Sequence, residues 1–108
     1  MATLQHNITT VLTQDLLKVG ENVSSIKYIS IANMDASNAA KIDLFLNKGG
    51  NNYYLLRNVE LPIQTTLVLG KEDNISFNNR SNGFSLRIQV DNGSTTAVPV
   101  DVIITRDL

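Results

Sequence analysis

The clearest pattern in the chain is an alternation of apolar and polar residues across residues 84–91. Successive side chains of a β-strand point to opposite faces, so this pattern predicts a strand with one buried face and one wet face. The strand is followed by Asn92 and Gly93, a pair that readily adopts the positive φ angles of a tight hairpin turn. We therefore expect residues 98–105 to return beside residues 84–91 as the second strand of a hairpin.

The polar faces of these two strands carry opposite charges. Arg87 lies on the wet face of the first strand, and Asp101 lies on the wet face of the second. Because hairpin neighbours lie side by side, we expect Asp101 to pair with Arg87. An exposed ion pair of this kind contributes about 0 to 1 kcal/mol to stability.

Other segments also have the periodicity of strands. In residues 42–46 one strand face carries Ile42, Leu44 and Leu46. In residues 61–69 one face carries Leu61, Ile63, Thr65, Leu67 and Leu69. Residues 26–32 are apolar on both faces. A strand that is apolar on both faces is typical of the centre of a sheet or of a strand covered by a partner. Shorter strand candidates are residues 6–12, 14–19, 53–57 and 74–77.

The spacing of these segments defines the fold class. Strands and turns recur about every 8 to 12 residues, which is typical of a β-sandwich or barrel. We predict an all-β fold, a compact antiparallel β-sandwich of about eight strands with Ig-like or jelly-roll topology. The predicted buried core consists of Ile29, Ile31, Leu44, Leu46, Leu67, Leu86, Ile88, Val100 and Val102.

Chain length indicates a single domain. One core commonly organises roughly 100 to 200 residues, so residues 1–108 are expected to form one unit. Residues 1–7 are too few to form a layer of their own, and chain ends are poorly ordered unless a neighbour holds them. We therefore expect residues 1–7 to form an N-terminal arm.

Composition narrows the range of partners. The formal net charge is -1, with nine basic and ten acidic residues spread along the chain, so no basic stripe is present to displace counterions from a nucleic acid. No apolar run approaches the ~20 residues that span a bilayer, and the amino terminus lacks a signal-peptide pattern. Cysteine is absent. We expect a protein made in the cytoplasm that binds neither nucleic acid nor membranes.

No combination of residues predicts catalysis or metal binding. His6 is the one histidine, so a Ser-His-Asp arrangement is not expected, and we interpret His6 as an exposed strand or terminal residue. Four acids flank turns, as solvated turn residues do: Glu60, Glu72, Asp73 and Asp91. One cluster of oxygen-bearing side chains has loop spacing but lacks the bidentate acid of a calcium site: Asn33, Asp35, Ser37 and Asn38. We predict no catalytic, cofactor-binding or metal-binding residues, no cofactor and no enzymatic activity.

Six segments spread from residue 2 to residue 104 carry a resemblance to known proteins: residues 2–8, 25–33, 41–46, 53–57, 61–69 and 99–104. In residues 25–33 an apolar strand ends in a small Asn/Asp loop. In these segments the chain resembles small β-sandwich virion structural proteins of tailed bacteriophages, in particular phages of marine bacteria and cyanobacteria. Those proteins often carry glycine where Gln64 stands here. The resemblance implies a capsid decoration or cement protein, or an accessory protein of the neck or tail.

A protein of this kind works by docking, so outward apolar residues and the N-terminal arm are the candidate interface. The candidate residues are Leu4, Ile8, Phe45, Tyr53, Tyr54 and Ile103. The expected partners are other copies of the chain, in a homo-oligomer such as a trimer, and virion proteins such as the major capsid protein; the expected location is the virion. The alternative is a carbohydrate or cell-surface recognition module, in which surface asparagines and Tyr53 or Tyr54 hold a sugar.

Overall fold

The computed structural model describes residues 2–18, 26–70 and 84–106, and its regular structure is entirely β. Eight strands follow one another along the chain: β1 (Ala2–Ile8), β2 (Gln14–Leu17), β3 (Ile26–Asn33), β4 (Ala40–Lys48), β5 (Asn51–Leu61), β6 (Thr66–Leu69), β7 (Ser85–Asp91) and β8 (Val100–Arg106). The predicted fold class, an antiparallel sandwich of about eight strands, is confirmed. The described residues include no helix long and apolar enough to cross a membrane.

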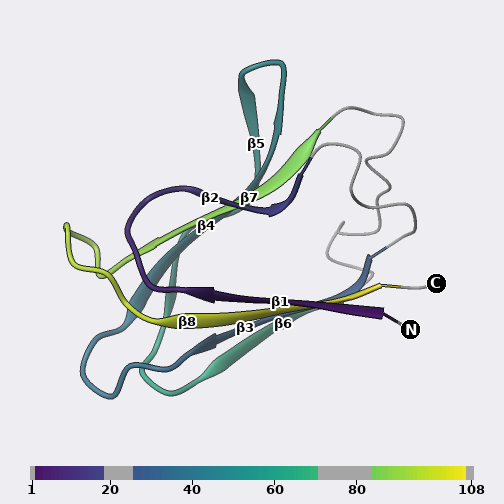
Figure 1. The fold of residues 1–108 in the computed structure, drawn as a ribbon. Coiled ribbons are helices and arrows are strands. Elements are labelled where there is room, and N and C mark those ends of the chain that lie inside the picture. The colour runs from purple at the N-terminus through teal and green to yellow at the C-terminus, as the bar shows by residue number, and fades with distance from the viewer. Residues whose placement is uncertain (1, 19–25, 71–83, 107–108) are drawn as a thin grey trace.

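The strands form two four-stranded sheets that pack as two layers (Figure 1). Sheet A has the order β1-β8-β3-β6, and sheet B has the order β2-β7-β4-β5. The antiparallel pairs are nested: β1 pairs with β8, β2 with β7, β3 with β6 and β4 with β5. This is the pairing of one long hairpin rolled up into two layers, so the topology is a jelly roll rather than an Ig-like sandwich.

The nested pairing corrects the predicted hairpin at residues 84–105. β7 lies in sheet B and β8 lies in sheet A, so the turn at Asn92 and Gly93 carries the chain from one layer to the other. The strands were predicted correctly, but their pairing was wrong. The expected pair of Arg87 with Asp101 is therefore also wrong, because these residues lie on different sheets.

The core lies between the sheets and consists of the inward faces of the strands. β7 and β8 bury every second residue, as the alternation predicted. The predicted core is confirmed: seven of its nine members are buried, and Leu46 and Leu67 are partly buried against the same cluster. The buried residues of the cluster also include Leu16, Leu17, Ile26, Ile42, Val90 and Ile104.

The predicted strand over residues 61–69 is two elements. Leu61 ends β5, residues 62–65 turn, and only β6 (Thr66–Leu69) continues in sheet A. Gln64 has a φ of 52°, in the left-handed region that glycine adopts without steric cost. A glycine at position 64 would adopt this conformation without strain. The predicted strand at residues 74–77 lies outside the described residues, as does Val19 at the end of another.

The prediction of a free N-terminal arm is wrong. Residues 2–8 are a full strand, β1, that pairs with β8 in an unbroken register from Ala2 with Arg106 to Ile8 with Val100. The arm was predicted because short chain ends need a neighbour to order them. Here β8 of the same chain is that neighbour.

Candidate interaction surface

The outer face of sheet A carries three exposed apolar side chains on three different strands. Tyr28 comes from β3, Val68 from β6 and Ile103 from β8, and each side chain is between 42% and 57% exposed. Ser30 pairs with both Val68 and Ile103, so these two residues flank it on the neighbouring strands. Tyr28 lies two positions from Ser30 on the same strand face. We call Tyr28, Val68 and Ile103 the apolar strip.

The residues between members of the apolar strip are small. Ser30 and Ala32 occupy the outward positions of β3, and Thr66 is outward on β6. Because these side chains are small, the larger side chains of the apolar strip project beyond them. Several exposed apolar groups gathered on one surface mark a site of interaction with another protein more often than an isolated one does.

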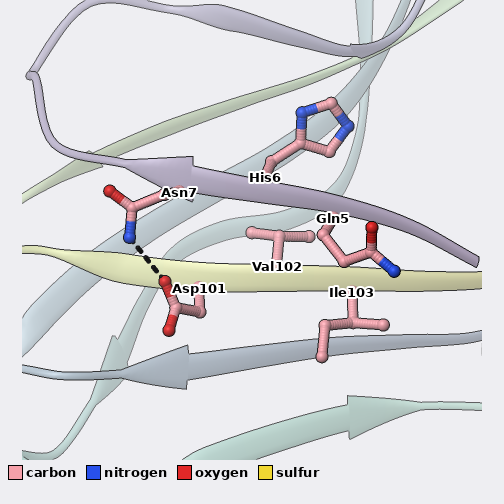
Figure 2. Close-up of a pocket in the computed structure, with 6 residues that line it drawn as sticks. All are labelled: Gln5, His6, Asn7, Asp101, Val102 and Ile103. Atoms are coloured by element: carbon pink, nitrogen blue, oxygen red, sulfur yellow. Dashed lines mark hydrogen bonds between the residues drawn. The ribbon is translucent and has the colours of Figure 1, made fainter.

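An open hollow of about 380 Å³ adjoins the apolar strip where β1 and β8 run side by side (Figure 2). At one end of this hollow Asn7 Nδ2 donates a hydrogen bond of 2.6 Å to Asp101 Oδ1. His6 and Val102 point to the opposite side of the sheet from Asp101 and Ile103 (Figure 2). The hollow therefore presents one carboxylate, already hydrogen-bonded, and no acid–base pair. Its lining residues are Gln5, His6, Asn7, Asp101, Val102 and Ile103.

On the outer face of sheet B, the prediction that Phe45 is an interface residue is wrong. Phe45 is only 4% exposed, because its ring packs against Tyr54 with 5.1 Å between centroids. The guanidinium of Arg57 lies 4.4 Å from the Tyr54 ring centroid on this outer face, in cation–π range. Phe45 is on the wet face of its strand, but a partly exposed tyrosine covers it.

The other predicted interface residues divide between core and surface. Ile8 is buried in the core, so its assignment to the interface is wrong. Leu4 is partly buried and packs against the same core. Ile103 and Tyr54 are exposed, and so is Tyr53, which lies on the β4–β5 hairpin whose tip stands out from the sandwich in Figure 1.

Two members of the apolar strip, Tyr28 and Val68, were not predicted as interface residues. The relevant signal was present, because residues 26–32 are apolar on both faces. β3 is an interior strand of sheet A, with β8 on one side and β6 on the other. Its outer face is nevertheless open at Tyr28. The strand is therefore central within its sheet, and its outer face also carries an exposed apolar side chain.

The predicted turn role of the Asn33–Asn38 cluster is supported by its hydrogen bonds. Asp35 Oδ1 accepts from the backbone N–H of Ser37 at 2.8 Å, and Asn33 Oδ1 accepts from the N–H of Asp35 at 2.9 Å. These are bonds that hold a turn closed. Within the described ranges, no group of three His, Cys, Asp or Glu side chains is arranged to hold a metal ion.

The hydrogen bonds to Asp35 make one contribution to stability depend on pH. The backbone N–H of Ser37, followed by the side chain of Asn38, lowers the pKa of Asp35 below its ordinary value of 3.8. A lowered folded-state pKa contributes stability that is present above the ordinary pKa and is lost as the pH falls through the folded-state pKa. We expect Asp35→Asn to lose less stability than the wild type on acidification from neutral pH to well below 3.8, measured as the urea midpoint. Equal losses in the two proteins would contradict this assignment.

The acids that flank turns are also engaged in local contacts. Asp91 Oδ1 accepts from the backbone N–H of Gly93 at 2.8 Å, and Glu60 lies 3.7 Å from Lys41 Nζ. Glu72 and Asp73 lie outside the described residues. The positions of Glu60 and Asp91 on the surface suit solvated turn and strand residues.

His6 differs from its prediction. It was expected to be exposed, but it is half-buried on the inward side of β1, and its Nε2 atom is buried without a hydrogen-bond partner among the described residues. Neither an acid nor a nucleophile is bonded to it there. The geometry required of a general base, a hydrogen bond to both a nucleophile and an orienting group, is not formed by the described residues.

Comparisons with known proteins establish the fold of this chain but do not assign the chain to a family. No family model matches the chain, and no curated protein matches it. Among solved structures, the nucleoplasmin-like N-terminal domain of Drosophila FKBP39 aligns with 98% of this chain and 89% of its own, at 14% identity and a TM-score of 0.56.

Two further structures were found at low identity. The Yersinia pseudotuberculosis-derived mitogen aligns over 98% of this chain and 85% of its own, at 16% identity and a TM-score of 0.51. The VP2 subviral particle of infectious bursal disease virus aligns over 97% of this chain but 32% of its own, with a TM-score of 0.35 that is too low to support an argument. The first two likenesses establish a shared β-sandwich fold, and a fold of this kind hosts many functions.

Proposed function

We propose that the protein is a non-enzymatic structural protein of a virus particle, a capsid decoration or cement protein of the tailed-phage type. The observation that carries the proposal is the apolar strip, in which Tyr28, Val68 and Ile103 stand exposed on the outer face of sheet A. A decoration protein needs a rigid scaffold and a surface that docks on a lattice, and it needs no active site. The outer face of sheet A provides that surface.

Two further features support this role. Several segments resemble virion proteins of tailed phages, as described above. Jelly rolls also build viral capsid domains, although they build lectin domains and cupins as well. The fold is therefore compatible with a decoration protein, and the evidence for that function comes from the apolar strip.

The test is to place a charge on the apolar strip. Ile103→Asp and Val68→Asp should each weaken binding to empty heads, prepared from a tailed phage that encodes the chain, by about tenfold or more, since burying an unpaired carboxylate in an interface costs at least ~1.4 kcal/mol. Thermal unfolding should change little, because both side chains are exposed. Binding is measured by co-sedimentation with the heads.

Ile63→Asp is the matched control. Ile63 is 43% exposed, close to the value for Ile103, but it lies in the turn between β5 and β6. This variant should bind as the wild type does. Equal binding by all three variants would contradict docking through the apolar strip. A wild-type protein that ignores the heads but binds a glycan, with loss of glycan binding in Tyr53→Ala, would support the recognition-module alternative instead.

A further inference from the structure

β1 is an edge strand of sheet A. It pairs with β8 on one side, and among the described strands none pairs with its other side. Figure 1 shows β1 at the border of its layer. The free side of an edge strand presents a row of backbone N–H and C=O groups, and another extended strand is the partner that satisfies such a row. The backbone groups along the free side of β1 are therefore suited to pairing with another β-strand.

Three of the four edge strands in the described sheets are protected against such pairing. β2 has four residues, a register shift and a charged residue, Asp15. β5 has register shifts, a positive φ at Asn58 and the charges of Arg57 and Glu60. β6 has only four residues. Shortness, charge and bulges are the usual means by which edge strands avoid pairing with other chains.

β1 has none of these protections. Its seven residues keep an unbroken register with β8, and none of them is Lys, Arg, Asp, Glu or Pro. A strand of this length offers about 24 Å of edge at ~3.4 Å per residue. β1 is thus a straight, uncharged edge, and no like charges oppose its pairing with another copy of itself.

A second observation is an exposed leucine in the segment that directly follows β1. Leu12 is 70% exposed and lies in residues 9–13, the connection from β1 to the sheet B edge strand β2. Leu12 thus adds exposed apolar surface close in sequence to the end of β1.

We propose that the free side of β1 pairs with β1 of a second copy of this chain, antiparallel and about a two-fold axis at Gln5. Centring the pair on Gln5 matches all seven residues of each strand and places Leu4 opposite the partner's His6. Positions that face inward in one copy then meet positions that face inward in the other, because the offset preserves the alternation. A two-fold contact of this kind is the commonest way in which identical subunits associate.

The pairing joins sheet A of both copies into one eight-stranded sheet. The outer faces of the two sheets become continuous, so that the two apolar strips lie on the same side of the dimer. The inference does not depend on the virion role, since it follows from the strand edge alone. The pairing would, however, give a docking protein two copies of its binding surface.

Cysteine cross-linking tests the register directly. The chain contains no cysteine, so Gln5→Cys introduces a single thiol per copy, placed opposite its equivalent. Residues directly opposite in an antiparallel pair have Cα atoms about 4.5 to 5.5 Å apart, within disulfide range. We expect Gln5→Cys to form a covalent dimer on mild oxidation.

Asn7→Cys is the matched control for the cross-link. Asn7 lies on the same outer side of β1, but in the proposed register it sits opposite the partner's Thr3, and the two copies of residue 7 are four positions apart, about 13 Å. This variant should stay uncross-linked. Equal cross-linking at both positions, or none at either, would overturn the proposed pairing.

Charge exchange at Gln5 gives an independent readout by sedimentation. Gln5→Lys and Gln5→Glu should each weaken self-association by about fivefold, because like charges lie directly opposite, and an equimolar mixture should restore it. Thr66→Lys, on the β6 edge of the same sheet, is the control and should self-associate as the wild type does.

Three outcomes would refute the pairing: a monomeric wild type, a trimer that the Gln5→Cys thiol does not cross-link, or a mixture that associates no better than either variant. Binding to phage heads is scored separately, so a monomer that still binds heads would leave the proposed function intact.

Discussion

Replacing Ile88 with alanine is expected to lower the free energy of unfolding by about 2 to 5 kcal/mol, as large-to-small changes in a packed core do. Ile88 is fully buried in the middle of β7. Its backbone is paired on both sides, with Gln14 of β2 and with Leu44 of β4. Because neighbouring strands hold the backbone in place on both sides, the sheet cannot move inward to fill the space, and a cavity remains between the layers.

The adjacent residue provides the control for Ile88. Arg87 lies on the outer face of β7, and its Nε donates to Asp15 Oδ1 at 2.8 Å on the partly exposed surface. Arg87→Ala is expected to cost less than about 1 kcal/mol, because exposed ion pairs contribute little. Urea unfolding of both variants measures the two losses in unfolding free energy, provided that the dependence of this free energy on urea concentration is the same in both. A larger loss for Arg87→Ala than for Ile88→Ala would mean that the register of β7 is wrong.

Replacing Asn33 with alanine is expected to cost about 2 to 4 kcal/mol. Asn33 is buried at the end of β3. Its Nδ2 lies 3.0 Å from the carbonyl oxygen of Asn38 and 3.1 Å from that of Leu61, so one amide joins the β3–β4 loop to the end of β5. Removing the amide leaves these carbonyls without their donor, and each buried group left unpaired costs about 1 to 3 kcal/mol.

Two further variants make the Asn33 prediction specific. Asn33→Asp keeps the shape but replaces the donating nitrogen by an acceptor, so it should be at least as damaging as alanine at neutral pH. Asn52→Ala removes an exposed amide whose oxygen accepts from Asn47 Nδ2 at 2.7 Å on the β4–β5 hairpin. This variant should change stability by no more than about 0.5 kcal/mol. Thermal unfolding of the three variants measures the differences. Similar losses at positions 33 and 52 would show that Asn33 does not hold the two loops together.

The sequence predicted the fold class and most of the core because the period of a strand is local. Ile88 and Arg87 are neighbours in sequence and point to opposite faces, so their burial follows from alternation alone. Residues 26–32 were placed correctly in the interior of a sheet for the same reason. The apolar outer side of this segment also contained the signal for the apolar strip.

Strand pairing could not be predicted in the same way. Asn92 and Gly93 form a turn in either topology, and a turn does not specify whether the following strand stays in its sheet or crosses to the other. The crossing depends on contacts between residues far apart in sequence, such as those of β8 with β1 and β3. β1 was predicted to be an arm because its partner lies at the other end of the chain.

Burial of individual side chains was also decided by the tertiary structure. Phe45 is on the wet face of β4 by its position in the alternation, and it is buried because a tyrosine from the neighbouring strand lies over it. Asn33 is a residue type common in turns. It is buried here because the β3–β4 loop and the end of β5 meet around its amide, which contacts the carbonyl oxygens of Asn38, Leu61 and Pro62. The sequence alone determined which face of each strand is apolar, since that property repeats every two residues. Only the folded chain determined which strands adjoin and what covers each face, because both depend on residues that are distant in sequence and close in space.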